Sequence, residues 1–296
     1  LFPGSGVTGD DCSAQSECHL AAICGPSGYS TSVSTDYIGY AFPSLDASDN
    51  DADGLPNYVE LREVKNPTVK DNDIFPDSYS GRRLFSMQAF RDFLNREGEE
   101  GGIYYWTNRL TQGADTRSSL IEAFFTSAEH QGIIAPVARL YFAYFRRIPD
   151  YVGLNYWVGQ SRGGMAVSAI SQLFANSEEF QLTYGSLTNR QFVERVYLNV
   201  LGRNPDQGGW NHWTGQLDAG MPRGQLMFLF SESAEYQATS YANIYVTMMY
   251  MGMLRRAPDQ GGYDYWVGYL NGGNSGQNLI GLFVASPEYR LRFLPS

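Results

Sequence analysis

The chain has 296 residues, of which 43% are hydrophobic and 15% aromatic, and it carries a formal net charge of −10. This apolar content is enough for a packed core and excludes a wholly disordered chain. The excess of carboxylates argues against binding to nucleic acid or to an anionic membrane, because both partners require a basic protein surface.

Residues 1–45 are rich in Gly, Ser and Thr, and we expect an irregular segment there. The segment contains every cysteine of the chain, Cys12, Cys18 and Cys24. Their clustering favours an extracellular disulfide clip that leaves one thiol over, and their spacing matches no zinc motif. No basic start precedes an apolar run, so either a signal segment has been removed or the chain is a fragment.

Residues 46–84 form a second segment, in which the acidic loop Asp49–Glu60 reads "DNDADGLPNYVE". Its spacing matches the EF-hand calcium pattern, in which alternate oxygen donors converge on one hard cation and Gly54 allows a sharp turn. The predicted calcium ligands are Asp49, Asp51, Asp53, the carbonyl of Leu55, Asn57 and Glu60. A helix is expected from about Pro56 but none before the loop. The segment therefore resembles the calcium loops of thrombospondin type 3 proteins more than a paired EF-hand.

Three further acidic residues follow the loop, and their carboxylates are additional candidate ligands. Their spacing alone does not select among them. These residues are Asp71, Asp73 and Asp77.

Residues 85–296 carry four copies of one pattern, at about 85–134, 135–187, 188–240 and 241–296. In each copy a Trp follows an Arg by 10 residues, and a Ser follows that Trp by 20 or 21. Recurrence at such a period identifies a tandem array of structural repeats. The motif residues are Arg96 and Trp106; Arg147, Asp150 and Trp157; Arg203, Asp206 and Trp213; and Arg256, Asp259 and Trp266.

The third copy illustrates the expected local structure. Apolar residues between Phe192 and Val200 recur at helical spacing and predict a first helix with one apolar face. Asn204 is expected to cap a second helix, with Pro205 in its first position. That helix carries Trp213, a third helix follows, and Ser233 caps a short fourth turn. No segment alternates as a strand does, so the predicted fold class is all-α.

Each motif Trp is predicted to belong to the core, because the residues three before and four after it are apolar or aromatic in most copies. A sugar-binding role is the alternative. The residue before each Trp is a better candidate for surface contact: Tyr105, Tyr156, His212 and Tyr265. The motif arginines are expected to bond carbonyls or the motif Asp, with anion binding as the alternative.

The repeats resemble a helical module common in secreted bacterial proteins, whose activity is unknown. Its hallmark is the phrase "LYxxxLGRxPDxxGxxYW" followed by "FxxSxEF", and the third copy matches it best, from Val196 to Trp213. The module is also similar to the linker domain of cyanobacterial phycobilisomes. The first copy departs from the pattern, with Gly98 and Glu99 in place of Pro–Asp, which leaves its helix start unspecified. The resemblance implies secretion and surface association.

No local catalytic motif occurs, and the three histidines are isolated, so the chain is predicted not to be an enzyme. We expect a secreted or cell-surface structural protein that binds Ca²⁺ and self-assembles into a filament or lattice through residues 1–45. The alternatives are an adhesin or carbohydrate-binding module with a glycan or cell-surface partner, and a polysaccharide-active enzyme. No membrane span is expected, because the longest uncharged stretch, 237–254, contains several polar residues.

Overall fold

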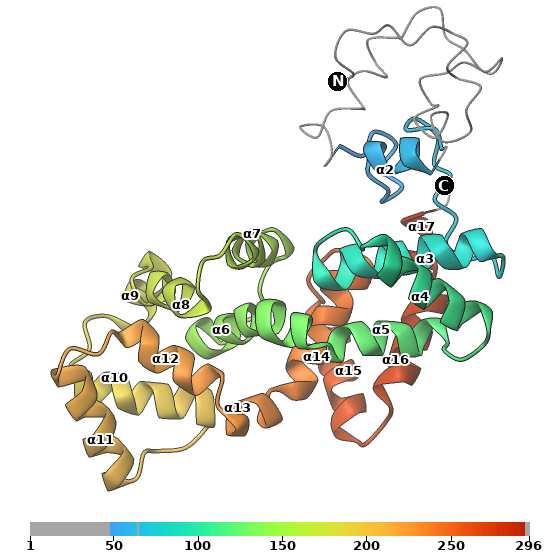
Figure 1. Ribbon diagram of the computed structural model, residues 1–296. Helices are drawn as coiled ribbons and strands as arrows, with labels where there is room; N and C mark the ends of the chain where they lie inside the picture. The colour runs from blue at the N-terminus through green and yellow to red at the C-terminus, as the bar shows by residue number, and fades with distance from the viewer. Residues whose placement is uncertain (1–47, 64, 294–296) are drawn as a thin grey trace, which may run out of the picture. The chain divides into compact units, whose positions relative to one another are not determined.

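The protein is described by a computed structural model that places residues 48–63 and 65–293 (Figure 1). These residues form α-helices and π-helical turns joined by loops and contain no strand, which confirms the predicted all-α class. They belong to two compact units, one of residues 1–88 and 285–296 and one of residues 89–284. The predicted cysteine segment, residues 1–45, lies outside the described residues.

The first unit contains the acidic loop, α2 (Asn57–Arg62) and α17 (Pro287–Leu291). Phe75 packs edge to face on Tyr289 and Phe293, with ring centroids 6.0 and 5.9 Å away. The guanidinium of Arg290 lies 4.4 Å from the centre of the Phe75 ring. The fully or nearly buried apolar side chains of the unit include Leu55, Val59, Ile74, Phe85, Met87, Tyr289 and Phe293.

The second unit, residues 89–284, holds most of the repeats. The first repeat comprises α3 (Tyr79–Leu94), within which this unit begins, α4 (Glu100–Thr111), α5 (Arg117–Thr126) and η4 (His130–Ile134). The second comprises α6 (Ala135–Phe145), α7 (Tyr151–Arg162), α8 (Val167–Ala175) and α9 (Glu178–Tyr184). The third comprises α10 (Asn189–Val196), η5 (Tyr197–Leu201), α11 (Gln207–Asp218), α12 (Arg223–Ser231) and α13 (Ala234–Thr239). The fourth comprises α14 (Tyr241–Met249), η6 (Tyr250–Leu254), α15 (Gln260–Asn271) and α16 (Gly276–Ala285). None of the described helices is both long and apolar enough to cross a membrane.

Aspartates cap the Trp-bearing helices in the last three repeats. Each accepts the backbone N–H three residues later, and the distance from Asp206 Oδ1 to Gly209 N is 2.8 Å. Asp150 and Asp259 make the same bond. The prediction of an Asn204 cap with Pro205 in the first helical position was therefore wrong. The helix begins at Gln207, because a carboxylate in the capping position satisfies a free N–H of the first turn.

The first repeat forms its Trp-bearing helix without the Pro–Asp pair. Helix α4 begins at Glu100, and Glu99 precedes it with extended backbone but no side-chain capping bond. The predicted serine caps are confirmed where the structure describes them. The hydroxyl of Ser233, for example, accepts the N–H of Tyr236 at 3.2 Å.

An arginine–aromatic stack recurs in all four repeats. The motif Arg lies 5.0–5.3 Å from the centre of an aromatic ring six residues earlier. The centroid of that ring lies 4.7–5.1 Å from the ring centroid of a Phe in the third helix of the repeat. The ring centroid of the motif Trp lies 5.4–5.6 Å from that of the same Phe. The members, in the order Arg, ring, Phe and Trp, are Arg96, Phe90, Phe124 and Trp106; Arg147, Tyr141, Phe174 and Trp157; Arg203, Tyr197, Phe230 and Trp213; and Arg256, Tyr250, Phe283 and Trp266.

The prediction that the motif Trp is a core residue is correct in part. Each Trp packs on the Phe of its stack, yet all four are half-buried rather than buried. The residue before each Trp is exposed, as predicted, and its ring lies edge on against the Trp: Tyr105, Tyr156, His212 and Tyr265.

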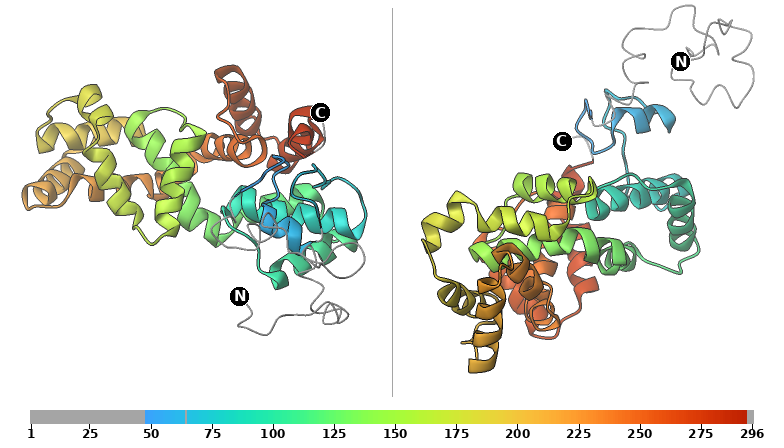
Figure 2. Two further views of the ribbon diagram at one scale, coloured as in Figure 1. Left: turned by 90° about the horizontal axis from the view of Figure 1, so that it is seen from above. Right: turned by 60° about the vertical axis from the view of Figure 1, so that its left-hand side comes forward.

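The second and third repeats pack closely through α8 and α12 (Figures 1 and 2). A Cβ added to Gly224 would lie 2.3 Å from the Cα of Gln172, so only glycine allows this approach. Ser171 Oγ donates to the carbonyl of Gly224 at 2.7 Å and joins the two helices.

The first and fourth repeats also touch each other, although they stand at opposite ends of the array. The rings of Phe125 and Tyr245 are 4.7 Å apart, and the Tyr245 hydroxyl donates to Glu122. The four repeats therefore do not form an open line in which each contacts only the next.

The arginine–aromatic stack makes a prediction for stability. Replacing Trp213 by Ala removes its contact with Phe230, and we expect the free energy of unfolding to fall by about 3 kcal/mol, near the lower end for a fully buried Trp. Thermal or urea unfolding measures the loss. The matched control is His212→Ala. Because the His212 ring is exposed, this substitution should change the free energy of unfolding by no more than about 0.5 kcal/mol. Equal effects of the two substitutions would contradict a structural role for Trp213.

Candidate calcium site

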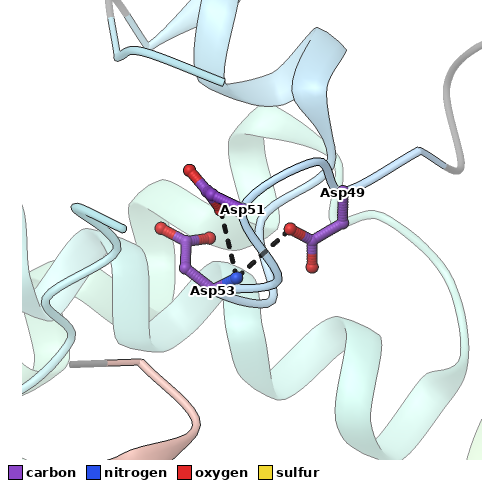
Figure 3. A group of neighbouring side chains, drawn as sticks. All are labelled: Asp49, Asp51 and Asp53. Atoms are coloured by element: carbon purple, nitrogen blue, oxygen red, sulfur yellow. Dashed lines mark hydrogen bonds between the residues drawn. The ribbon is translucent and has the colours of Figure 1, made fainter. Parts of the chain in front are cut away.

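The acidic loop is folded by its own carboxylates (Figure 3). The N–H of Asp53 donates to Asp49 Oδ1 at 3.2 Å and to Asp51 Oδ1 at 3.1 Å. The N–H of Gly54 donates to Asp49 Oδ2 at 2.9 Å, and the positive φ of Gly54, 91°, makes the turn that glycine tolerates best. These bonds curl the backbone so that the alternate side chains face one another.

Five carboxylates gather in two overlapping groups. Ligand oxygens of Asp49, Asp51 and Asp53 lie within 4.8 Å of one another, and so do those of Asp53, Glu60 and Asp71. Asp53 belongs to both groups. The loop thus places the predicted acidic ligands in two adjoining groups that Asp53 links.

Glu60 is the carboxylate of the cluster whose burial is least offset by hydrogen bonds. Its side chain is fully buried, and neither carboxylate oxygen has a hydrogen-bond partner among the described residues. Asp51 Oδ2 is buried and unpartnered as well. A buried carboxylate without a partner is costly unless it is protonated or neutralised by a cation.

The segment after α2 closes the site. The backbone N–H groups of Asp71 and Asn72 donate to Asp53 Oδ2 at 3.0 and 2.7 Å, and the amide of Asn72 donates to the carbonyl of Asp53 at 3.2 Å. The ammonium of Lys65 lies 3.0 Å from Asp71 Oδ1 and supplies one positive charge beside the cluster. One lysine does not balance five carboxylates.

Of the three additional acidic candidates, Asp71, Asp73 and Asp77, only the first joins the carboxylate cluster. Asp71 joins Asp53 and Glu60, as described above. Asp73 instead accepts the N–H of Phe75 at 3.0 Å, and a carboxylate oxygen of Asp77 lies 3.8 Å from Arg82. Sequence spacing did not select Asp71, because its approach depends on the return of the chain after α2.

Two other predicted ligands are buried in the loop. Leu55 is fully buried, and its N–H donates to Asp53 Oδ1 at 2.9 Å. The side-chain oxygen of Asn57 accepts the N–H of Asn50 at 3.0 Å, so this residue braces the loop in the structure. Coordination through the Leu55 carbonyl and Asn57 stays a prediction.

The electrostatics of the cluster favour protonation when no cation is bound. Burial, followed by the charges of Asp51, Asp53, Asp71 and Asp49, raises the pKa of Glu60 to about 8. Burial and the neighbouring charge of Asp53 raise the pKa of Asp51 to about 6. Burial also raises the pKa of Asp53. A bound cation would stabilise the ionised forms and displace these protons.

The charged motif residues of the repeats have partners within the fold. Arg147 and Arg203 bind Glu179 and Glu235, with closest distances of 2.7 and 3.1 Å, and Arg96 binds Glu129 at 2.7 Å. Sequence reasoning missed these glutamates, although each stands two residues after the motif Ser. The predicted carbonyl contact is confirmed for Arg256, which donates to Ala257 at 3.1 Å.

One histidine is a core residue. His130 is fully buried against Phe125, with ring centroids 4.9 Å apart. Burial, with a smaller contribution from the charges of Arg139 and Arg162, lowers its pKa to about 3. The imidazole is therefore neutral at physiological pH.

These features define an all-α protein of tandem helical repeats with an acidic loop in a separate unit. Its repeats match the model of a domain of unknown function, DUF4214, over residues 78–134, 171–240 and 239–293. The chain belongs to this family. Helices α6 and α7 lie outside the matched segments, yet the second repeat has the same arginine–aromatic stack as the others. Searches of curated proteins and of solved structures found no match.

The raised pKa values predict a pH dependence of the calcium-free protein. The pKa of Glu60 rises from 4.5 to about 8 on folding, so its contribution to stability is complete below pH 4.5 and is lost as the pH rises through about 8. Asp51 acts in the same direction. In a chelator, hydrogen exchange at residues 48–63 should accelerate over this range by more than the intrinsic chemical rate does.

Saturating Ca²⁺ should remove that acceleration, and Glu60→Gln should reduce it in the chelator, because the amide cannot ionise. Exchange rates that follow only the intrinsic chemical pH dependence would show that Glu60 is not destabilising when ionised.

Proposed function

We propose that this protein is a non-catalytic, calcium-binding structural protein of the extracellular space or cell surface. The observation that carries the calcium assignment is Glu60, a fully buried carboxylate whose two oxygens have no partner among the described residues and which lies in a cluster with four aspartates. A structure that buries such a group gains most from a cation that the group can bind directly.

Calcium fits the donors better than other common metals. The five side chains of the cluster offer only carboxylate oxygens, whereas zinc sites use mainly nitrogen and sulfur. Magnesium keeps several waters and is seldom enclosed by so many protein carboxylates. Asp49, Asp51, Asp53, Glu60 and Asp71 would hold the ion, and neutralising their mutual repulsion would stiffen the loop.

Calcium titration tests the assignment directly. After removal of bound ions with a chelator, isothermal titration with CaCl₂ should give one site, and melting of the first unit should shift upward. Glu60→Gln should weaken binding about tenfold or more, since it removes a charged ligand. Asp73→Asn is the matched control and should bind as the parent does, because Asp73 caps Phe75 and is no member of the cluster. The absence of calcium binding would refute the assignment.

The structural role is proposed to involve self-assembly. The family model is that of a domain of unknown function, and the motif arginines and aspartates are engaged in holding the repeats. Residues 1–45 are proposed to dock on another copy, with the loop fixing their exit direction once calcium is bound.

Sedimentation and electron microscopy test this role. Assemblies should grow with protein concentration in Ca²⁺, and removing residues 1–45 should abolish them while leaving the helical circular dichroism unchanged. A full-length chain that stays monomeric in Ca²⁺ at high concentration would contradict self-assembly but not calcium binding.

A secreted adhesin or carbohydrate-binding module is the second candidate. The observation in its favour is the exposed aromatic ring beside each motif Trp, since Tyr105, Tyr156 and Tyr265 are 52, 57 and 64% exposed. Aromatic rings with one polar edge are suited to sugar recognition. Binding to a glycan array, lost on replacing these tyrosines by Ala, would support this candidate.

A further inference from the structure

A groove of about 700 Å³ lies in the second unit, where the second, third and fourth repeats meet. Its walls come from the end of α6, from η5, and from α13, α14 and α15. Helix α14 contacts α6, α13 and α15, and these four helices are labelled in Figure 1. This volume falls within the usual range for small-ligand sites. The groove is built by the second, third and fourth repeats together, so no single copy of the repeat contains it.

The lining combines aromatic rings with free polar groups. Phe142 and Tyr263 are half-buried in the groove, with nearly parallel rings whose centroids are 6.4 Å apart. The hydroxyl of Tyr236 and the side-chain amide of Asn243 have no hydrogen-bond partner within residues 48–63 and 65–293. Ring surfaces beside unpaired hydroxyl and amide groups are suited to the apolar faces and the hydroxyls of sugars.

Arg146 supplies an unpaired positive charge at the groove. No carboxylate of the described residues forms an ion pair with it, and its side chain is exposed. The neighbouring Arg147 differs, because Glu179 neutralises it at 2.7 Å. The guanidinium of Arg146 is therefore available to a carboxylate of a ligand, which it could bind through two parallel hydrogen bonds.

The backbone of Arg146 is unfavourable for an arginine. Its φ is +52°, in the left-handed region that favours glycine. The equivalent turn of the third repeat uses Gly202, with φ +65°, and that of the first uses Asn95. The fourth repeat has Arg255 there, but its guanidinium lies 3.8 Å from Asp92. Arg146 thus stands at a strained position without an ion pair to any residue of 48–63 or 65–293, as occurs at ligand sites.

We propose that this groove binds an oligosaccharide that bears carboxylates, with Arg146 as the anion contact and Phe142 and Tyr263 as the apolar wall. The hydroxyl of Tyr236 and the amide of Asn243 bond the sugar hydroxyls. The site is separate from the calcium loop and from the exposed tyrosines beside the motif tryptophans.

The substitution Arg146→Gly tests the anion contact without harming the fold. Glycine relieves the left-handed backbone, as at Gly202, so the melting temperature should stay the same or rise. Isothermal titration of the full chain with trigalacturonate should show binding that this variant weakens about tenfold or more. The matched control is Arg255→Gly, the same backbone change in the fourth repeat, which should leave affinity unchanged.

Further arms separate the alternatives. Maltotriose, which has no carboxylate, should bind more weakly than trigalacturonate, and Tyr236→Phe should lower the affinity for trigalacturonate. Glu60→Gln should have no effect, which separates this site from the proposed calcium site. A lack of trigalacturonate binding would overturn the proposal, and so would unchanged binding in Arg146→Gly. Equal binding of tetraglutamate would show an acidic-peptide site and overturn the sugar assignment.

Discussion

The repeats are organised around a guanidinium held between a ring and a carboxylate. In three repeats the planar group of the motif Arg lies over the aromatic residue six positions earlier and makes two hydrogen bonds to a Glu about 32 residues later. This contact ties the turn after the first helix to the short fourth segment, with the Trp-bearing helix between them. Arginine suits the position because its fork matches a carboxylate and its face stacks on a ring, and lysine offers neither.

The strength of this contact varies with its surroundings. The side chains of Arg203 and Glu235 are each 48% exposed, so their ion pair contributes little to stability and acts mainly by fixing geometry. In the first repeat Glu129 is more enclosed and also accepts Arg162 from the second repeat. Hydrogen bonding by Arg96, followed by that of Arg162, outweighs burial and lowers the pKa of Glu129 to about 2. The motif glutamate thus forms ion pairs both within its own repeat and with the next repeat.

The sequence predicted the parts of the fold that are decided locally. Helix class, the serine caps and the exposure of the residue before each Trp follow from spacing within a few residues. The predicted start of α11 was two residues too early. Asn204 and Asp206 are both residue types that cap helices well, and local rules alone do not choose between them. Contact between the first and fourth repeats could not be predicted, since it depends on how the chain turns over more than a hundred residues.

The candidate calcium site shows the same division. The clustering of Asp49, Asp51, Asp53 and Glu60 could be predicted because the EF-hand pattern places its candidate donors at fixed local intervals. Asp71 entered the cluster through hydrogen bonds from its own backbone and that of Asn72 to Asp53, which no local spacing specifies. The site is thus half a local motif and half a tertiary arrangement.

Charge pairing separates the structural residues of this chain from those available for binding. The motif arginines and aspartates of the repeats are engaged with glutamates, carbonyls and helix N-termini of the same unit. Groups so paired have little capacity left for a ligand. Glu60 and Arg146 are different. Among the described residues, the buried carboxylate of Glu60 has no hydrogen-bond partner and the guanidinium of Arg146 has no carboxylate partner. They belong to different units of the chain, and each is therefore the starting point of a separate proposal.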